Sequence, residues 1–186
     1  MSVTPTVQDR PELRKVIQGP LGLTDTLVPD TRTEVPEPHA HACYRYEEDG
    51  ERKTVDVTRQ NPSWISTGGD MISTTRDLHT FVSALLGGRL LPAPLLAEMC
   101  EPHPKAGYCL GVFVQPGPDG KGTVITHNGG IAGGHAALLY STPDGSTTLT
   151  AALNWVDDAG LSLGVPFQQA TQRLVEEVFG DGRAAG

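Results

Sequence analysis

A histidine at the end of a short β-branched run has neighbours that suit acyl-transfer chemistry. The run Thr123–Thr126 reads T-V-I-T, and His127, Asn128, Gly129 and Gly130 follow it directly. An imidazole exchanges protons near neutral pH, glycines let a ligand approach a strand closely, and backbone N–H groups can stabilise an oxyanion. The short pattern H-x-G also fits a histidine in an ordinary turn, so the residues alone leave both interpretations open.

Strands are predicted on both sides of this histidine. The run T-V-I-T is preceded by G-Y-C-L-G-V-F-V-Q over residues 107–115 and followed by H-A-A-L-L-Y-S over residues 135–141. The turn sequence T-P-D-G-S then leads into T-T-L-T-A-A-L-N over residues 147–154, which predicts a hairpin around the D-G pair. Together these runs predict an antiparallel sheet of three to four strands.

Helices are predicted to flank the sheet. Residues 73–88 contain a helix that Thr74 can cap and that the pair Gly87-Gly88 ends. Its apolar face consists of Leu78, Phe81, Val82, Leu85 and Leu86. A last helix is predicted from about Val165 to Phe179, with an apolar face of Phe167, Ala170, Leu174 and Val178. Helices before and after an antiparallel sheet indicate an α+β fold.

The segment before these elements is less regular. A short helical piece is predicted at Pro11–Gln18, and a second short helix at Pro92–Cys100. Between Pro20 and Ser63 the chain is rich in proline and shows no sustained period, apart from a hairpin predicted around E-E-D-G-E-R-K. Long irregular segments of compact proteins are commonly functional or lack a packing partner.

Composition excludes several classes of partner. The chain has 186 residues, a formal net charge of -8 and a pI of about 5.1, with no Lys/Arg cluster, so neither nucleic acid nor an anionic membrane is expected to bind. No apolar run approaches the ~18 residues of a membrane span. The first residues lack a signal-peptide pattern, so the sequence as written predicts a cytoplasmic location.

Metal and cofactor sites are not predicted. The three cysteines, Cys43, Cys100 and Cys109, form no C-x-x-C pair, which argues against a disulfide framework and a zinc site. His39, His41 and Cys43 lie close together in P-H-A-H-A-C and contain donor atoms that bind zinc or copper. No fourth ligand is evident beside them, so the sequence predicts neither a metal nor a cofactor.

Four stretches resemble one enzyme family in order and spacing. They are G-P-L-G-L-T-D-T-L-V-P over residues 19–29, the segment from S-W-I-S-T-G-G-D to L-L-G-G-R-L-L over residues 63–91, Y-C-L-G-V-F-V over residues 108–114, and the segment from H-N-G-G-I-A-G-G to T-L-T-A-A-L-N over residues 127–154. The chain resembles the C-terminal part of the penicillin-recognising serine hydrolases, which include β-lactamases, esterases and Streptomyces-type D-Ala-D-Ala carboxypeptidases. The resemblance runs from about Gly19 to the C-terminus and implies the β-lactamase/transpeptidase-like fold.

The resemblance also implies roles for individual residues. The H-x-G at His127 is similar to the third motif of the family, the counterpart of K-T-G, so His127 would share a proton at the site. Asn128 and Gly129 would contact substrate, and the N–H of Gly130 would serve the oxyanion. Trp64 resembles an aromatic residue that lines the pocket, although its pattern equally fits a packing tryptophan.

Two motifs of the family are not found in this sequence. Its nucleophile motif S-x-x-K has no match, because the nearest candidate, Ser73 with Arg76, places an arginine where the family has lysine. An arginine stays protonated and cannot act as a base. Its motif Y-x-N has no match either, and Phe113 stands where carboxypeptidases of this type carry an arginine for the substrate carboxylate.

The sequence therefore predicts two alternatives. In the first, residues 1–18 are a loose N-terminal segment, and residues 19–186 are the C-terminal portion of a serine hydrolase that acts on an amide or ester. Its substrate would be a small molecule or peptide, and it would need a missing N-terminal half or self-association. In the second, the chain is a catalytically inert remnant or binding module. Proteins of the family are usually secreted or periplasmic, so a lost N-terminus would also have lost the export signal.

Overall fold

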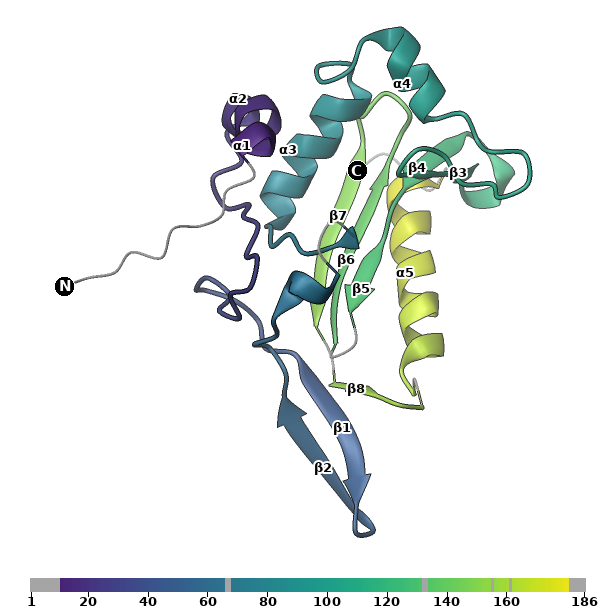
Figure 1. The fold of residues 1–186 in the computed structure, drawn as a ribbon. Helices are drawn as coiled ribbons and strands as arrows, with labels where there is room; N and C mark the ends of the chain where they lie inside the picture. Colours follow the sequence, from purple (N-terminus) through teal and green to yellow (C-terminus); the bar gives the residue numbers. More distant parts are fainter. Residues whose placement is uncertain (1–10, 66–67, 132–133, 155, 161, 181–186) are drawn as a thin grey trace, which may run out of the picture.

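The central element is an antiparallel sheet between two helical layers (Figure 1). The computed structural model describes residues 11–65, 68–131, 134–154, 156–160 and 162–180. The sheet has five strands: β3 (Phe113–Pro116), β4 (Thr123–Thr126), β5 (Gly129–Ile131), β6 (His135–Ser141) and β7 (Thr148–Asn154). β6 is the central strand, because it pairs with β4 and β5 on one side and with β7 on the other.

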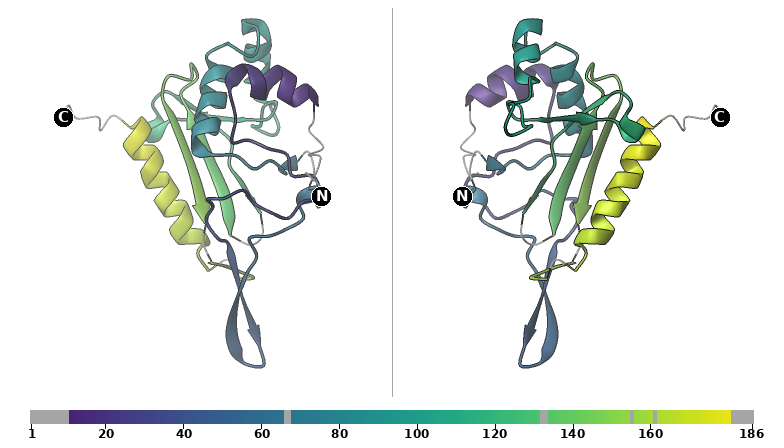
Figure 2. Two further views of the ribbon diagram at one scale, coloured as in Figure 1. Left: turned by 90° about the vertical axis from the view of Figure 1, so that its left-hand side faces the viewer. Right: turned by 90° about the vertical axis from the view of Figure 1, so that its right-hand side faces the viewer.

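Helices α3 (Thr75–Leu86) and α5 (Gly164–Phe179) cover opposite faces of this sheet (Figure 2). Successive side chains of a strand point to opposite faces of the sheet. In β4, Ile125 lies in the cluster that includes Val82 and Leu86 of α3. The neighbouring Val124 lies in the cluster that Phe167, Val175 and Phe179 of α5 cover. The α+β fold with flanking helices is therefore confirmed.

Helix α3 begins where the sequence predicts. The side chain of Thr74 accepts the N–H of Asp77, which satisfies a donor that the first helical turn leaves free. The shorter α4 (Ala93–Met99) follows, and Leu96 and Met99 pack against the cluster that includes Val82. The C-terminal helix differs in detail, since Val175 and Phe179 face the sheet while Leu174 is 42% exposed. Leu174 and Val175 are adjacent and lie on the two margins of the apolar stripe, so helical periodicity does not decide which of them faces the sheet.

The strand before the histidine is shorter than predicted. β3 begins only at Phe113, because residues 108–113 form a tight turn closed by a Tyr108–Phe113 bridge. Within it, the Cys109 N–H donates to the Val112 carbonyl at 2.9 Å, and Gly111 has a φ of 89°. This left-handed conformation suits glycine and interrupts a run that otherwise has strand composition.

A hairpin of β1 (Cys43–Glu48) and β2 (Glu51–Asp56) projects from the body, as Figures 1 and 2 show. Its turn residues Asp49 and Gly50 both have positive φ, which confirms the hairpin predicted at the D-G pair. The first residues of β1 also pair in parallel with β8 (Val156–Asp158), which joins the hairpin to the end of the sheet region.

The N-terminal part runs alongside α3. Residues 11–21 are helical throughout, as α1 (Pro11–Leu13), the π-helical η1 (Arg14–Gln18) and α2 (Gly19–Leu21). The helix crosses Gly19 without a break, so the division predicted there stays a prediction. The described residues also include the 3-10 turns η2 (Pro62–Trp64) and η4 (Pro118–Gly120). In the part of the chain that the structure describes, no helix is long and apolar enough to cross a bilayer.

Candidate functional site

His127 lies inside one continuous strand rather than after its end. β4 and β5 pair with β6 in a single register, since Thr126 is opposite Tyr140 and Gly129 is opposite Ala137. Between these pairs, the N–H of His127 donates to the carbonyl of Leu139 at 3.1 Å. The stretch from β4 through His127 to β5 is therefore one strand with a local disturbance and no inserted residue.

This register fixes the direction of each backbone group. In an antiparallel ladder, alternate residues bond to the same neighbour. Because His127 bonds to β6, Gly129 also faces β6, and the N–H of Gly130 is directed to the opposite side. On that side β3 ends its pairing at the Phe113–Thr126 pair, and among the described strands none pairs with β5 there. Gly130 thus directs its N–H to an open edge, and the oxyanion role predicted for it stays a prediction.

The two glycines leave unfilled space at this edge. Neither Gly129 nor Gly130 has a positive φ, so the backbone conformation does not require glycine at either position. A Cβ added at Gly129 would meet nothing within 4 Å, and one at Gly130 would make ordinary contacts, the nearest at 3.5 Å to the carbonyl of His135. The packing of the chain therefore does not explain why residue 129 is glycine. A glycine with free space beside it is expected where a ligand lies against the strand.

The His127 ring lies in an aromatic cluster. His127 is exposed, and it follows Ile125 by two residues, which places its side chain on the α3 side of the sheet. Its ring centroid is 6.4 Å from that of Tyr108 and 6.3 Å from that of Phe113, and the Tyr108 and Phe113 centroids are 4.5 Å apart. The tight turn before β3 thus brings two aromatic rings to the open edge.

Asn128 has a structural task on the other face. Its side-chain amide donates to the hydroxyl of Tyr140 at 2.7 Å, and its side-chain oxygen accepts the N–H of Leu139 at 3.2 Å. Tyr140 is 6% exposed and belongs to the cluster beneath α5. A substrate group that binds the Asn128 side chain would have to compete with these bonds, and the predicted substrate contact stays a prediction.

Trp64 lies at the end of a 3-10 turn and is largely exposed. It ends η2, whose start is capped by the side chain of Asn61, and it is 69% exposed. Its exposure fits a surface that a ligand or a further protein segment covers. The His127 ring contacts those of Tyr108 and Phe113. The pocket-lining role of Trp64 stays a prediction.

The nearest sequence match to a nucleophile serves the structure. The hydroxyl of Ser73 is 2.8 Å from that of Thr26, and Thr26 donates to a carboxylate oxygen of Asp77 at 2.7 Å. Asp77 also accepts the N–H of Asp25 at 3.0 Å and is 4% exposed. This network joins the segment after α2 to the start of α3, and Ser73 receives no basic partner within it.

The histidines near the hairpin differ in their surroundings. His41 Nδ1 is 2.6 Å from Asp56 Oδ2, and the hydroxyl and N–H of Thr58, followed by His41, hold the pKa of Asp56 well below its usual value. His135 has a buried Nε2 without a hydrogen-bond partner, and burial lowers the pKa of its imidazole. Among the residues described, no group of three or more His, Cys, Asp or Glu is placed to hold a metal ion.

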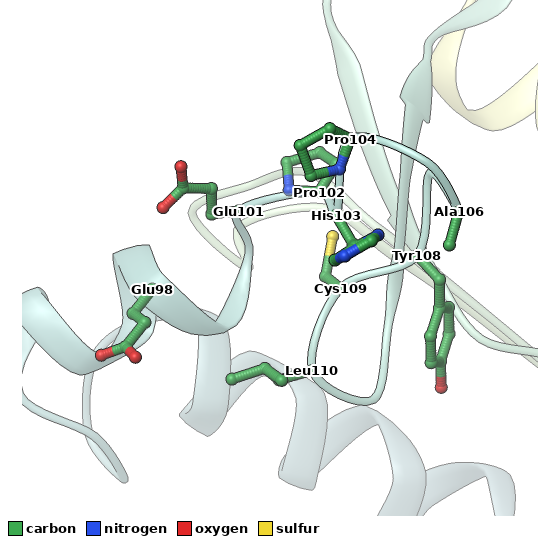
Figure 3. A pocket seen from close by; sticks show the side chains of 9 residues that line it. All are labelled: Glu98, Glu101, Pro102, His103, Pro104, Ala106, Tyr108, Cys109 and Leu110. Atoms are coloured by element: carbon green, nitrogen blue, oxygen red, sulfur yellow. The ribbon is translucent and has the colours of Figure 1, made fainter.

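An open depression lies beside the turn that carries Tyr108, and the Tyr108 side chain is one of those that line it (Figure 3). It measures about 530 Å³ and lies between the end of α4 and the loop that follows. Its lining includes Glu98, Glu101, His103, Cys109 and Leu110. The lining is mainly apolar. Tyr108 belongs both to this lining and to the aromatic cluster around His127, so the depression adjoins the candidate site.

Two residues of the site were not predicted from the sequence. Tyr108 was read only as part of a strand, and Tyr140 only as a residue of β6. The glycine at residue 111 was the available signal for Tyr108, because a Y-x-x-G segment before a strand can turn the aromatic ring back toward it. No local signal marks Tyr140, since its bond to Asn128 spans twelve positions and depends on strand register.

The antiparallel sheet with α3 and α5 on opposite faces is the arrangement of a known fold family. The sequence model described as Beta-lactamase matches residues 12–166, so the chain belongs to the beta-lactamase family. The structure is similar to a D-stereospecific amidohydrolase from Streptomyces sp., with 37% identity and a TM-score of 0.66. That match covers 76% of this chain and 42% of the amidohydrolase.

A second similar enzyme is the D-amino acid amidase from Ochrobactrum anthropi SV3. Its structure has 26% identity and a TM-score of 0.68, over 90% of this chain and 51% of the amidase. Its complex with L-phenylalanine amide, at 24% identity and a TM-score of 0.68, covers 89% of this chain and 50% of that one and shows likeness of fold alone. The chain thus spans about half the length of the solved structures it matches.

Proposed function

We propose that this chain supplies the substrate-binding strand of a serine hydrolase that cleaves amides of D-amino acids. The observation that carries the proposal is the edge of β5, where the Gly130 N–H is directed outward and the space beside Gly129 is empty. A substrate carbonyl placed there would receive one oxyanion hydrogen bond. His127, at the same edge, would exchange a proton with the reacting groups.

The amide class is supported by the relatives. The Streptomyces enzyme is a D-stereospecific amidohydrolase, and the Ochrobactrum enzyme is a D-amino acid amidase. The D-Ala-D-Ala carboxypeptidase that the sequence also resembles stays a narrower alternative, and with it a role in peptidoglycan or penicillin binding. Phe113 argues against it, because an aromatic ring offers no charge-assisted bond to a terminal carboxylate.

The nucleophile must come from outside these 186 residues, because the sequence contains no S-x-x-K. A further segment of the same protein, a separate polypeptide or a second copy of the chain would each place it within reach of His127. The proposed acyl transfer would then use a serine of that segment as nucleophile. The alternative is an inert binding module that retains the strand without any acyl transfer.

Complementation tests the proposal. The chain would be produced with the part of the Streptomyces amidohydrolase that it does not match, and ammonia release from D-phenylalanine amide would be measured. We expect no turnover by either part alone and turnover by the assembled pair. His127→Ala should lower the rate of the pair about 100-fold or more, as expected for a proton-transfer group. His79→Ala, at an exposed histidine of α3 that bonds Thr148, is the matched control and should have a much smaller effect.

Covalent labelling separates the two alternatives. A fluorophosphonate that reacts with activated serines should leave this chain unlabelled and label the complementing part in the assembled pair. Labelling of this chain alone would show that it carries its own nucleophile and contradict the proposal. An assembled pair that neither reacts with the probe nor hydrolyses the amide would favour the inert binding module.

A further inference from the structure

Two aromatic rings border the open edge of the strand that carries His127. The rings of Tyr108 and Phe113 lie 4.5 Å apart at 58°, an arrangement close to edge-to-face. Both are within 6.4 Å of the His127 ring, measured between centroids. We call these two residues, Tyr108 and Phe113, the aromatic wall.

The aromatic wall rests on a fixed base. Cys109 and Val112, which lie between the two aromatic residues, are 5% and 8% exposed and belong to the core cluster with Val82. The Tyr108–Phe113 bridge and the hydrogen bond from Cys109 to Val112 close the turn. The rings are therefore held in place by buried neighbours, and ligand binding would need little reordering.

The wall nevertheless leaves apolar surface open to solvent. Phe113 is 45% exposed although its neighbour Val112 is buried, and Leu110 at the tip of the turn is 67% exposed. Apolar surface that lies beside a functional edge marks a ligand contact. The unfilled space at Gly129 adjoins the same edge, so a ligand that fills it would lie near the His127 ring and the wall.

Electrostatics decide which ligands this surface favours. The face of an aromatic ring carries negative potential, so it attracts cations and disfavours carboxylates. The chain's formal net charge of -8 acts in the same direction. An amino acid amide is cationic through its ammonium group, whereas the amino acid produced by hydrolysis carries a carboxylate as well.

We propose that the aromatic wall makes the site selective for amino acid amides with a free ammonium group and an uncharged carboxamide, and against the carboxylate product. Tyr108 and Phe113 act as specificity-determining residues for the reaction suggested above, and the inference rests on that proposed function. Hydrolysis converts a ligand that the wall favours into one that it disfavours, which promotes product release.

Binding to the chain alone tests the proposal, because it requires no nucleophile. Backbone amide signals would be followed by NMR while the 186-residue chain is titrated with D-phenylalanine amide and, separately, with D-phenylalanine. We expect saturable shifts at Gly129 and Gly130 and a Kd for the amide that is about threefold lower. Both ligands carry the ammonium group, so the difference arises from the carboxylate, which the ring faces and the negative net charge disfavour. N-acetyl-D-phenylalanine amide, which is neutral, should bind with intermediate affinity.

Substitutions at Phe113 give the sharpest test. Phe113→Leu keeps an apolar side chain without the ring and should bring the two dissociation constants close together. Phe113→Arg introduces a guanidinium that pairs with carboxylates, so the preference should reverse toward D-phenylalanine. Tyr46→Arg is the matched control, because it makes the same change of charge at a 40% exposed aromatic residue on the projecting hairpin. It should leave the wild-type preference intact.

Three results would overturn the inference: equal affinity of the wild-type chain for amide and acid, an unchanged preference in Phe113→Arg, or no shift at Gly129 and Gly130 with either ligand. Circular dichroism of each variant identifies a folding defect, and Phe113→Leu then carries the comparison. Failure of the proposed function gives a different pattern, in which the chain prefers the amide but the complemented pair does not hydrolyse it.

Discussion

The side-chain amide of Asn128 donates to the hydroxyl of Tyr140 at 2.7 Å and thereby joins the strand of the candidate site to the core beneath α5. The side-chain oxygen of Asn128 accepts the N–H of Leu139, so one side chain satisfies a ladder donor and a buried phenol. The disturbance of the strand at His127 and Asn128 is therefore held in place by side-chain hydrogen bonds. This disturbance comes just before the open edge at Gly130, and the register with β6 is the same before and after it.

Removal of the Asn128 side chain should destabilise the protein. Asn128→Ala leaves the Leu139 N–H and the Tyr140 hydroxyl without these partners, and it should lower the free energy of unfolding by about 1–3 kcal/mol. Asn128→Asp should cost less, because a phenol can donate to a carboxylate as readily as it accepts from an amide. Urea unfolding of both variants checks the order. Equal losses in Asn128→Ala and Asn128→Asp would contradict this account.

The glycine of the H-x-G pattern should be dispensable for folding but not for binding. Gly129→Ala meets nothing within 4 Å, so the free energy of unfolding should change by less than about 0.5 kcal/mol. A ligand against the strand would meet the new methyl group, and its binding free energy should weaken by about 1–3 kcal/mol, which raises Kd about 5- to 150-fold. Thermal unfolding and an NMR titration with D-phenylalanine amide measure the two effects.

Gly145 provides the opposite case within the same chain. It has a φ of 70°, and a Cβ there would lie 3.1 Å from the carbonyl of Ser83. Gly145→Ala should therefore lower the free energy of unfolding by more than about 1 kcal/mol while the binding site keeps its affinity. If Gly129→Ala proved equally destabilising, the empty space would have a structural rather than a ligand-binding origin.

The sequence predicted the elements better than their contacts. Helical periodicity and the Thr74 cap located α3, and the D-G pairs located both hairpins, because these signals act within a few residues. The short strand β3 was predicted too long, because its composition is typical of a strand and only the positive φ at Gly111 turns the chain. The choice of Val175 over Leu174 on α5 depends on the sheet that the helix covers.

The candidate site was predicted only in part, because sequence signals act within a few residues and some of its residues are distant in the sequence. The spacing of His127, Gly129 and Gly130 is local, and the register then fixes which backbone groups reach the open edge. Tyr140 and the Tyr108 ring enter the site through strand pairing and a tight turn, which a linear pattern does not encode. The proton and substrate roles assigned to these residues stay predictions.

The buried carboxylate of Asp77 should be among the larger side-chain contributions to stability outside the apolar core. It accepts the Thr26 hydroxyl at 2.7 Å and the Asp25 N–H at 3.0 Å, so it tethers the segment after α2 to α3. Asp77→Ala leaves both donors without this acceptor and should cost about 3 kcal/mol, since hydrogen bonds to charged groups are each worth about 1.5–3 kcal/mol. Urea unfolding measures the loss.

Asp77→Asn is the matched variant, because it keeps an oxygen acceptor and loses only the charge. We expect a smaller loss of about 1 kcal/mol. Thr26→Val removes one of the two donors and should cost a similar amount. If Asp77→Ala lowers the free energy of unfolding no more than Thr26→Val does, the tether contributes little. The contacts of residues 19–29 with α3 would then be mainly apolar.

The turn between β6 and β7 should give the protein a pH dependence in the acid range. The Thr142 hydroxyl, followed by the N–H and hydroxyl of Ser146, lowers the pKa of Asp144 from 3.8 to about 2. The folded state therefore favours the ionised carboxylate more than the unfolded state does. The stabilisation that this carboxylate provides is complete above about pH 4 and is lost as the pH falls toward about 2.

Asp144→Asn isolates this contribution. The difference in free energy of unfolding between wild type and variant should be constant above about pH 4 and should shrink as the pH falls to about 2. Thr142→Val removes the largest cause of the shift, so the carboxyl resonance of Asp144 should titrate closer to 3.8 in that variant. A wild-type midpoint already near 3.8 would show that these turn hydrogen bonds do not favour the charged form. Because Asp144 is exposed to solvent, added salt and water screen the effect, and NMR titration of the carboxyl carbon measures it more directly than unfolding does.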